Sequence, residues 1–191
     1  YKYVVILSQM NGHILLSRHK ERTTWETQGG HIESGETPLQ AAHRELFEES
    51  GAAEYTLMPL CDYWAGSGDG LHGESGVVFT ANIRKLDNLP ESEMAEVQCF
   101  DVIPDNLTYP PITKEILRYM EDAPTRILIG TTNPSKVKLF ADMLSGTHTQ
   151  LFTLADLEIH SEPEETGSTL AENAEIKAAY YARYADNVIC M

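Results

Sequence analysis

The chain has 191 residues, of which 42% are apolar, and a formal net charge of −15 at pH 7. This apolar content is enough for a packed core, and no apolar run is long enough to predict a membrane span. The strong negative charge argues against binding to nucleic-acid polymers, whose affinity comes largely from Lys and Arg side chains that neutralise phosphates. The cysteines Cys61, Cys99 and Cys190 are widely spaced, which predicts neither a disulfide framework nor a zinc site and is typical of a cytoplasmic protein.

The first elements are predicted to be two strands, over residues 3–7 and 13–17. Asn11-Gly12 stands between them, and this dipeptide between apolar runs predicts a β-hairpin. A cationic cluster that begins at Arg18 follows, and we expect either a solvated turn or a contact for phosphates, which Arg grips with two N–H groups. A strand over residues 24–27 is expected to lead into Gln28-Gly29-Gly30, where glycines let the backbone approach a ligand closely.

A helix is predicted over residues 38–50. Thr37 fits the N-cap, Pro38 the first turn, and Gln40 completes a capping box. Gly51 stands where a left-handed C-cap belongs. The helix is therefore well bounded at both ends.

Three glutamates crowd one face of this predicted helix. They border its apolar stripe at positions i, i+3 and i+4, as Glu45, Glu48 and Glu49. Each like-charged neighbour costs about 0.2–0.5 kcal/mol, and only Arg44 offers local compensation. Two interpretations stay open: a solvated acidic face, or a site for a hard divalent cation such as Mg²⁺, which prefers oxygen ligands.

The stretch from Gly30 to Ala52 fits the pattern G-x5-E-x7-R-E-U-x-E-E-x-G-U, in which U is a bulky apolar residue. It resembles the Nudix box, and the resemblance extends over residues 1–121. It implies a hydrolase of diphosphate linkages. It also implies an α+β fold, the Nudix alpha/beta/alpha sandwich with a mixed sheet.

The Nudix resemblance also implies roles for single residues. It implies that Mg²⁺ (or Mn²⁺) is held by three glutamates and a backbone carbonyl, namely Glu45, Glu48, Glu49 and Gly29. The catalytic base would be Glu45, Glu48 or Glu96. Arg18 and Gly30 would contact the substrate, whereas Glu36 and Arg44 would hold the loop and helix in place.

Two positions depart from the Nudix pattern. Gln28 stands where the family usually has a proline before the two glycines, which we expect to alter the loop or the base pocket rather than the metal site. Thr113 stands where MutT-like relatives carry an asparagine that recognises the oxidised guanine. The resemblance therefore does not extend to selectivity for 8-oxoguanine.

Further strands are predicted over residues 55–64, 77–83 and 96–100, before a helix over 113–121. Residues 65–76 contain five glycines and are expected to form a mobile loop at the mouth of the site, which would act as a lid. Tyr63 and Trp64 either stack on a nucleobase or belong to the core, and the core is favoured.

Residues 121–125 are predicted to be a linker that separates a domain over 1–123 from a segment over 124–191. A strand over 126–130, helices over 137–144 and 170–185, and a strand over 188–191 are expected in this segment. Thr169 and Glu172 predict a capping box for the second of these helices. A strand, a polar loop and a helix N-terminus together can hold a phosphate.

Residues 126–191 resemble the N-terminal part of the inosine triphosphate pyrophosphatase family. The resemblance implies phosphate and metal contacts at matching positions, which are Thr131, Asn133, Lys136, Glu165 and Lys177. The sequence stops before the D-S-G that carries the family's catalytic aspartate. We therefore expect a truncated α/β unit that is catalytically inactive and has unpaired sheet edges.

Together the two resemblances imply hydrolysis of a nucleoside triphosphate to its monophosphate and pyrophosphate, which would sanitise the nucleotide pool. Alternatives are hydrolysis of ADP-ribose, a dinucleotide or another nucleoside-diphosphate derivative, or a nucleotide-sensing regulator without turnover. The expected partner is a small-molecule nucleotide, with no nucleic-acid polymer and no membrane, and a homodimer is left open.

Overall fold

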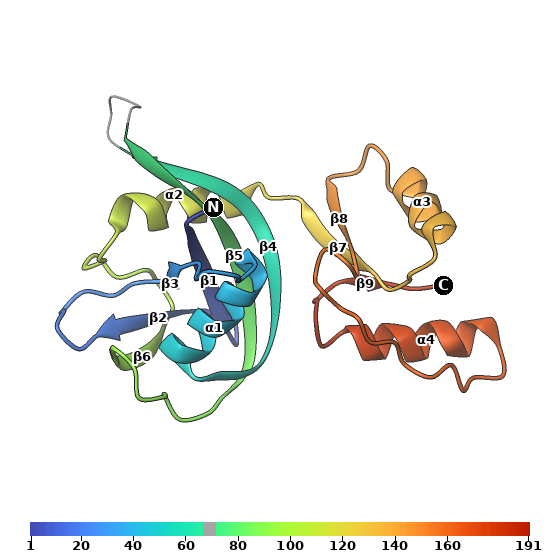
Figure 1. The fold of residues 1–191 in the computed structure, drawn as a ribbon, viewed down its shortest axis with the longest axis horizontal. Coiled ribbons are helices and arrows are strands. Elements are labelled where there is room, and N and C mark those ends of the chain that lie inside the picture. The colour runs from blue at the N-terminus through green and yellow to red at the C-terminus, as the bar shows by residue number, and fades with distance from the viewer. Residues whose placement is uncertain (67–71) are drawn as a thin grey trace. The chain divides into compact units, whose positions relative to one another are not determined.

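The computed structural model describes residues 1–66 and 72–191. The chain divides into two compact units, Tyr1–Ala123 and Pro124–Met191 (Figure 1). No helix among the described residues has the length and apolar character needed to cross a membrane.

The first unit is built on a six-stranded mixed sheet. Its strands are β1 (Tyr3–Met10), β2 (His13–His19), β3 (Gln28–His31), β4 (Ala52–Gly66), β5 (Gly73–Leu86) and β6 (Met94–Phe100). They are ordered β4-β5-β1-β2-β6, and β3 pairs with β1. The β1–β5 pair is parallel and the other pairs are antiparallel, so the predicted mixed sheet is confirmed.

The helices α1 (Pro38–Ser50) and α2 (Pro110–Glu121) lie on opposite faces of this sheet. Val4 and Ile6 of β1 pack with the buried residues of α1, whereas Leu7 packs with Ile116 of α2. Because successive side chains of a strand point to opposite faces, the two helices cover the two sides of β1. This arrangement confirms the alpha/beta/alpha sandwich.

The helix α1 has the predicted bounds and both predicted caps. The backbone N–H of Gln40 donates to Thr37 Oγ1 (3.2 Å), and the N–H of Thr37 donates to Gln40 Oε1 (3.0 Å). Gly51 adopts the left-handed conformation with φ 71°. The apolar stripe Leu39, Ala42 and Leu46 is buried against the sheet. Local sequence signals therefore fix the element that carries the acidic residues.

The other predictions for the first unit had mixed outcomes. The Asn11-Gly12 hairpin is confirmed, with positive φ at both residues as a primed turn requires. A strand over 24–27 was wrong: Trp25 and Glu26 make only isolated bridges, and the strand is β3, in which both glycines pair with β1. A side chain at Gly29 would overlap the Val4 carbonyl oxygen of β1, and one at Gly30 would overlap the Glu45 carboxylate of α1.

The predicted glycine-rich loop is also shorter than expected. Residues 65–66 and 73–76 continue β4 and β5, and the predicted lid falls on residues 67–71, outside the described part of the chain. Tyr63 packs against the cluster under α2, but Trp64 is 54% exposed, so the core assignment was wrong for Trp64.

The second unit has a three-stranded parallel sheet ordered β8-β7-β9, with two helices. Its elements are β7 (Thr125–Ile129), α3 (Pro134–Met143), β8 (Thr149–Thr153), α4 (Leu170–Tyr181) and β9 (Val188–Ile189). The helix α4 ends earlier than predicted because the Tyr184 N–H bonds the Tyr181 carbonyl (2.9 Å), a tighter turn that stops the helix. The predicted capping box of Thr169 and Glu172 is confirmed.

Candidate active site

The glycine segment of β3 packs directly against two glutamates of α1. The backbone N–H of Gly29 donates to Glu49 Oε2 (2.8 Å). A Cβ added at Gly30 would overlap the carboxylate of Glu45. The glycine at position 30 therefore lets the backbone lie against a carboxylate that a larger residue would push away.

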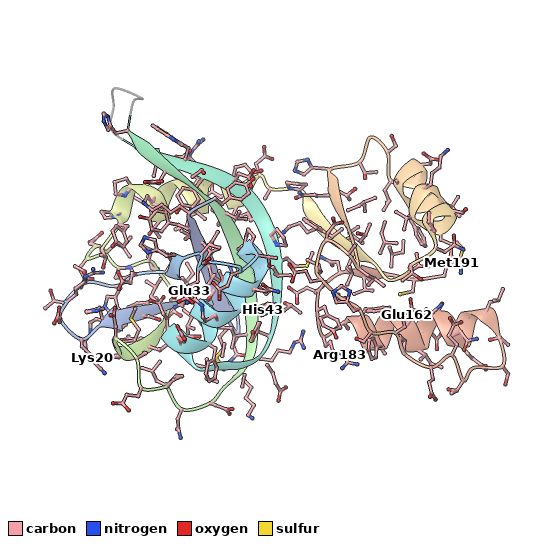
Figure 2. The ribbon with its side chains drawn as sticks, viewed as in Figure 1. Lys20, Glu33, His43, Glu162, Arg183 and Met191 are labelled. Carbon is pink, nitrogen blue, oxygen red and sulfur yellow. The ribbon has the colours of Figure 1, made fainter. Side chains whose placement is uncertain are left out.

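Arg44 links the loop to the helix. Its guanidinium donates to both carboxylate oxygens of Glu36, at 2.8 and 2.9 Å, and to the carbonyl oxygen of His31 at 3.0 Å. The backbone N–H of Glu33, labelled in Figure 2, also donates to Glu36 (3.0 Å). The bonds from Arg44 and Glu33 lower the pKa of the Glu36 carboxyl to about 2. These contacts support the scaffold role proposed for Glu36 and Arg44.

The same guanidinium reaches the acidic face of α1. Arg44 Nη1 donates to Glu45 Oε1 at 2.8 Å, whereas its contact with Glu48 Oε2 is 3.5 Å. The side chain of Glu45 is 13% exposed and that of Glu48 is 50% exposed. Glu48 is therefore the member of the acidic group that water reaches most easily.

Burial makes the charged form of Glu49 unfavourable. Burial raises the pKa of Glu49 to about 8, the negative charges of Glu45, Glu26 and Glu48 add to the rise, and the hydrogen bond from Gly29 opposes it. Burial also raises the pKa of Glu45, while Arg44 opposes that shift. The acidic face is thus a crowded and partly desolvated group of carboxylates.

Among the residues that the structure describes, no three His, Cys, Asp or Glu side chains converge closely enough to form a ready metal-ligand group. The carboxylates of Glu45 and Glu49 are turned toward Arg44 and Gly29 instead. The available donors nevertheless fit a hard divalent cation, because all are oxygens and the missing Cβ at Gly30 leaves the Glu45 carboxylate against open backbone. A cation there would offset the burial and the repulsion that together raise the pKa of Glu49.

A buried relay connects β3 to the end of α1. Gln28 Nε2 donates to Ser17 Oγ (2.7 Å), and Ser17 Oγ donates to the carbonyl oxygen of Glu49 (2.7 Å). The side chains of Gln28 and Ser17 are fully buried. Gln28 Oε1 and Ser8 Oγ are buried without a hydrogen-bond partner among the described residues. Leaving such a group unpaired costs about 1–3 kcal/mol.

Arg18 and Glu96 lie on neighbouring strands and pair with each other. Arg18 Nη2 is 2.6 Å from Glu96 Oε2, and the guanidinium lies over the ring of Trp25 at 5.9 Å from its centroid. Leu16, two residues before Arg18, packs with Trp25, whereas Ser17 bonds the end of α1. Because side chains alternate along a strand, Arg18 and Glu96 point to the sheet face opposite α1. The structure therefore does not bring them together with the three glutamates.

Sequence reasoning missed three buried polar residues near α1. Glu26 is 6% exposed, pairs with Arg22 at 2.7 Å, and lies close enough to raise the pKa of Glu49. Ser17 and Gln28 were not recognised as partners of the helix. The available signal was polar residues at positions where strand alternation predicts burial. Thr113, by contrast, is buried and donates its hydroxyl to the Tyr109 carbonyl (3.1 Å).

The residues singled out in the second unit fall into two groups. Asn133 Oδ1 accepts from the Ser135 N–H (2.9 Å) as the N-cap of α3, and the Asn133 N–H donates to Thr131 Oγ1 (3.2 Å). The charged residues pair elsewhere. Glu165 pairs with Lys177 at 2.5 Å, and Lys136 contacts the carbonyl oxygen of Met191, which is labelled in Figure 2, at 2.8 Å.

A cavity of about 650 Å³ opens at the carboxyl ends of β7 and β8. Thr131 and Pro134 line it from the loop before α3, and Leu154 and His160 line it from the segment after β8. Ligands often bind at this end of parallel strands. Of the residues that the resemblance implied, Thr131 is the one found in the lining.

Comparison with protein-family models matches both units. The NUDIX domain model matches residues 2–119, and the Ham1 family model matches residues 127–191. The two matches follow the division of the chain into its compact units.

Relatives and solved structures agree with these matches. A dITP/XTP pyrophosphatase of Thermoanaerobacter pseudethanolicus is 36% identical over 64 residues, which are 34% of this chain and 32% of that protein. An RNA pyrophosphohydrolase of Baumannia cicadellinicola subsp. Homalodisca coagulata is 36% identical over 62 residues, 31% of this chain and 39% of that protein. The chain thus spans about a third of the length of the curated relatives that it matches.

A crystal structure of a Bacillus subtilis pyrophosphohydrolase superposes with a TM-score of 0.50 at 26% identity, covering 62% of this chain and 82% of that chain. This likeness agrees with the family-model match over more than half of the sequence. The contact of Arg44 with the box residue Glu36 and that of Gly29 with Glu49 agree with it as well. The chain therefore belongs to the NUDIX family.

Proposed function

We propose that the first unit hydrolyses a diphosphate linkage in a nucleoside polyphosphate in a reaction that depends on a divalent metal. The favoured reaction converts a nucleoside triphosphate to its monophosphate and pyrophosphate. The observation that carries the proposal is the packing of Glu45 and Glu49 against the backbone of two glycines, with Glu49 buried and its pKa raised to about 8. Carboxylates with strongly perturbed pKa values cluster at functional sites.

Glu45, Glu48, Glu49 and the carbonyl of Gly29 would hold Mg²⁺ or Mn²⁺. When bound, such an ion supplies stabilisation of charge on phosphoryl oxygens and lowers the pKa of water. The missing side chain at Gly30 lets the Glu45 carboxylate lie directly against the backbone of β3.

Glu48 is the favoured acceptor for the proton of the attacking water. Its side chain is half exposed, and the nearest cation, Arg44, is 3.5 Å away. Glu45 is held by Arg44 at 2.8 Å, and Glu96 is held by Arg18 at 2.6 Å on the other face of the sheet. These pairings make Glu45 and Glu96 weaker candidates, since both carboxylates already accept hydrogen bonds from a guanidinium.

The second unit supports a triphosphate substrate. Its relatives include proteins described as dITP/XTP pyrophosphatases, a description that names nucleoside triphosphates as their substrates. Thr131, Asn133, Lys136, Glu165 and Lys177 would contact phosphates or metal there. A cytoplasmic location fits an enzyme of the nucleotide pool, and the wide spacing of the three cysteines agrees with a reducing compartment. Self-association into a homodimer is left open.

A second candidate substrate is the 5′-triphosphate end of RNA. It is favoured by the relatives described as RNA pyrophosphohydrolases and opposed by the net charge of −15. Hydrolysis of ADP-ribose or a dinucleotide, and nucleotide sensing without turnover, stay as alternatives.

A substrate panel on the full chain with Mg²⁺ or Mn²⁺ tests the proposal. Standard and deaminated nucleoside triphosphates, ADP-ribose, a dinucleotide and a 5′-triphosphorylated oligonucleotide are compared for release of pyrophosphate and monophosphate. Glu49→Gln keeps a hydrogen-bond acceptor for Gly29 and is expected to lower kcat/KM at least about 100-fold, the upper end of the loss seen when only a ligand's neighbour is removed. Nucleotide binding without turnover of any compound would favour the sensor.

A further inference from the structure

We propose that Gln28 is a positioning residue that acts through Ser17 to hold Glu49 in the place where a divalent cation would bind. The inference rests on the proposed function of the acidic face. Its basis is the relay in which Gln28 Nε2 donates to Ser17 Oγ and Ser17 Oγ donates to the Glu49 carbonyl, each at 2.7 Å.

Two adjacent residues of β3 hold Glu49 at its carboxylate and, through Ser17, at its backbone carbonyl. The Gly29 N–H binds the carboxylate at 2.8 Å, and Gln28 reaches the backbone carbonyl through Ser17. A side chain fixed at its carboxylate alone can still move with its helix turn. Because the carbonyl is fixed as well, the distance between the last turn of α1 and the backbone of Gly29 is held constant.

The chemistry of the three groups in the relay determines which of them donates in each hydrogen bond. Ser17 has one hydroxyl proton, and the Glu49 carbonyl can only accept, so Ser17 must accept from the amide nitrogen of Gln28. This leaves Gln28 Oε1 as the amide atom without a partner among the described residues.

The unpaired oxygen argues against a role in packing alone. An apolar side chain of similar length would fill the same space without burying an unpaired acceptor. The glutamine is nevertheless fully buried, at a position where the Nudix pattern usually has a proline that can donate no hydrogen bond. The amide donor is therefore the property that distinguishes this residue.

The test is the Mn²⁺ affinity of the metal-free full chain, titrated by electron paramagnetic resonance, together with urea unfolding without metal. Gln28→Met removes the donor and the unpaired acceptor while it keeps the length of the side chain. We expect it to weaken Mn²⁺ binding about 10- to 100-fold, as loss of a group that orients a metal ligand does. The unfolding midpoint without metal should not fall below that of the wild type.

Ser17→Ala cuts the relay at its middle, so it should weaken Mn²⁺ binding at least as much as Gln28→Met. The double variant should be no worse than Ser17→Ala alone, because the two residues act in series. Ser17→Thr keeps the hydroxyl and should restore most of the affinity. The matched control is Ser8→Ala, which removes the other buried unpaired group and should leave Mn²⁺ affinity within about twofold of the wild type.

The proposal is overturned if Gln28→Met binds Mn²⁺ within about twofold of the wild type while Glu49→Gln does not, and the proposed function then still stands. It is equally overturned if affinity falls only together with metal-free stability, since that is a structural effect. A Gln28-dependent Mn²⁺ site in a protein that hydrolyses no substrate supports the positioning role and contradicts the enzymatic one. A wild type that binds no Mn²⁺ overturns both.

Discussion

The two units hold their charged residues in different ways. In the first unit, the guanidinium of Arg44 donates hydrogen bonds from two nitrogens to Glu36, at 2.8 and 2.9 Å. In the second unit, Lys177 meets Glu165 through its single ammonium group. A planar fork fixes the orientation of its partner, whereas a point charge on a flexible stem lets the partner turn.

The glycines of the two units also differ in how far the atoms around them can move. A Cβ at Gly29 would overlap the carbonyl oxygen of Val4, a backbone atom within the sheet. A Cβ at Gly130, after β7, would meet the side chains of Cys190 and Tyr181, which have rotamers to change. The first site is thus fixed by backbone and fork contacts, and the second is bounded by groups that can adjust. This difference predicts unequal tolerance to substitution.

The largest expected effect is from Gly29→Ala. The new methyl group has no space beside β1, and φ of 154° adds strain, so we expect a loss of about 3 kcal/mol in the free energy of unfolding. Gly130→Ala should cost about 1 kcal/mol, because side chains can move. Urea unfolding followed by tryptophan fluorescence and by circular dichroism measures both. Equal losses would contradict the comparison.

Gly35→Ala is a control that separates backbone strain from steric overlap in the Gly29→Ala variant. Gly35 has φ of 92° and no atom within 4 Å of an added Cβ. Gly35→Ala should therefore show the backbone strain alone, about 1–2 kcal/mol.

Arg44→Ala is expected to have the next largest effect. It leaves the carboxylates of Glu36 and Glu45 without their cation, and we expect the thermal midpoint of the first unit to fall by about 4–8 °C or more. Activity should fall together with stability. Arg118→Ala, which breaks an exposed pair with Glu115, is the matched control and should change little. Activity lost at unchanged stability and metal affinity would contradict a scaffold role for Arg44.

The two capping boxes allow the two units to be compared with the same substitution, Thr to Ala. Thr37→Ala and Thr169→Ala each remove the side-chain cap of one helix and should each cost about 1 kcal/mol. Trp25 and Trp64, the two tryptophans of the chain, both lie in the first unit, so their fluorescence reports on that unit. Thr37→Ala should shift the fluorescence midpoint, and Thr169→Ala should not. A shift with both would show that the units unfold together.

The smallest expected effect is a dependence on pH. The folded pKa of Glu36, about 2, lies below its usual value of 4.5, because ionisation is favoured by Arg44. The stabilisation is therefore fully present above the usual value and is lost as the pH falls toward the folded pKa. The difference in urea midpoint between wild type and Glu36→Gln should be constant near neutral pH and shrink in that acidic range. A constant difference down to pH about 2 would contradict this assignment.

Much of the fold followed from local sequence signals. The caps of α1 and α4, the Asn11-Gly12 turn and the apolar stripe of α1 each depend on residues within a few positions of one another, and the structure agrees with all of them. Thr24 to Thr27 was misassigned because β-branched and aromatic residues favour strands locally. The pairing of β3 with β1 instead depends on two glycines that have low strand propensity.

The candidate site could be predicted only where its residues share one helix. The three glutamates and Arg44 lie on α1 and followed from spacing. The Arg18–Glu96 pair and the bond from Ser17 to Glu49 join residues 78 and 32 positions apart. Which face a strand side chain takes depends on register, and one shifted residue reverses it. Register between distant strands is not encoded in any short stretch of sequence.

The parallel register of β1 and β5 has a consequence for synthesis of the chain. Tyr3 pairs with Gly76, so 73 residues (76 − 3) separate the partners. At about 5–20 residues per second, a ribosome needs roughly 4–15 s to deliver the second partner after the first. During that interval the edge of β1 that will pair with β5 is exposed to neighbouring nascent chains. The soluble yield should therefore fall when translation is slowed between the codons for these two strands.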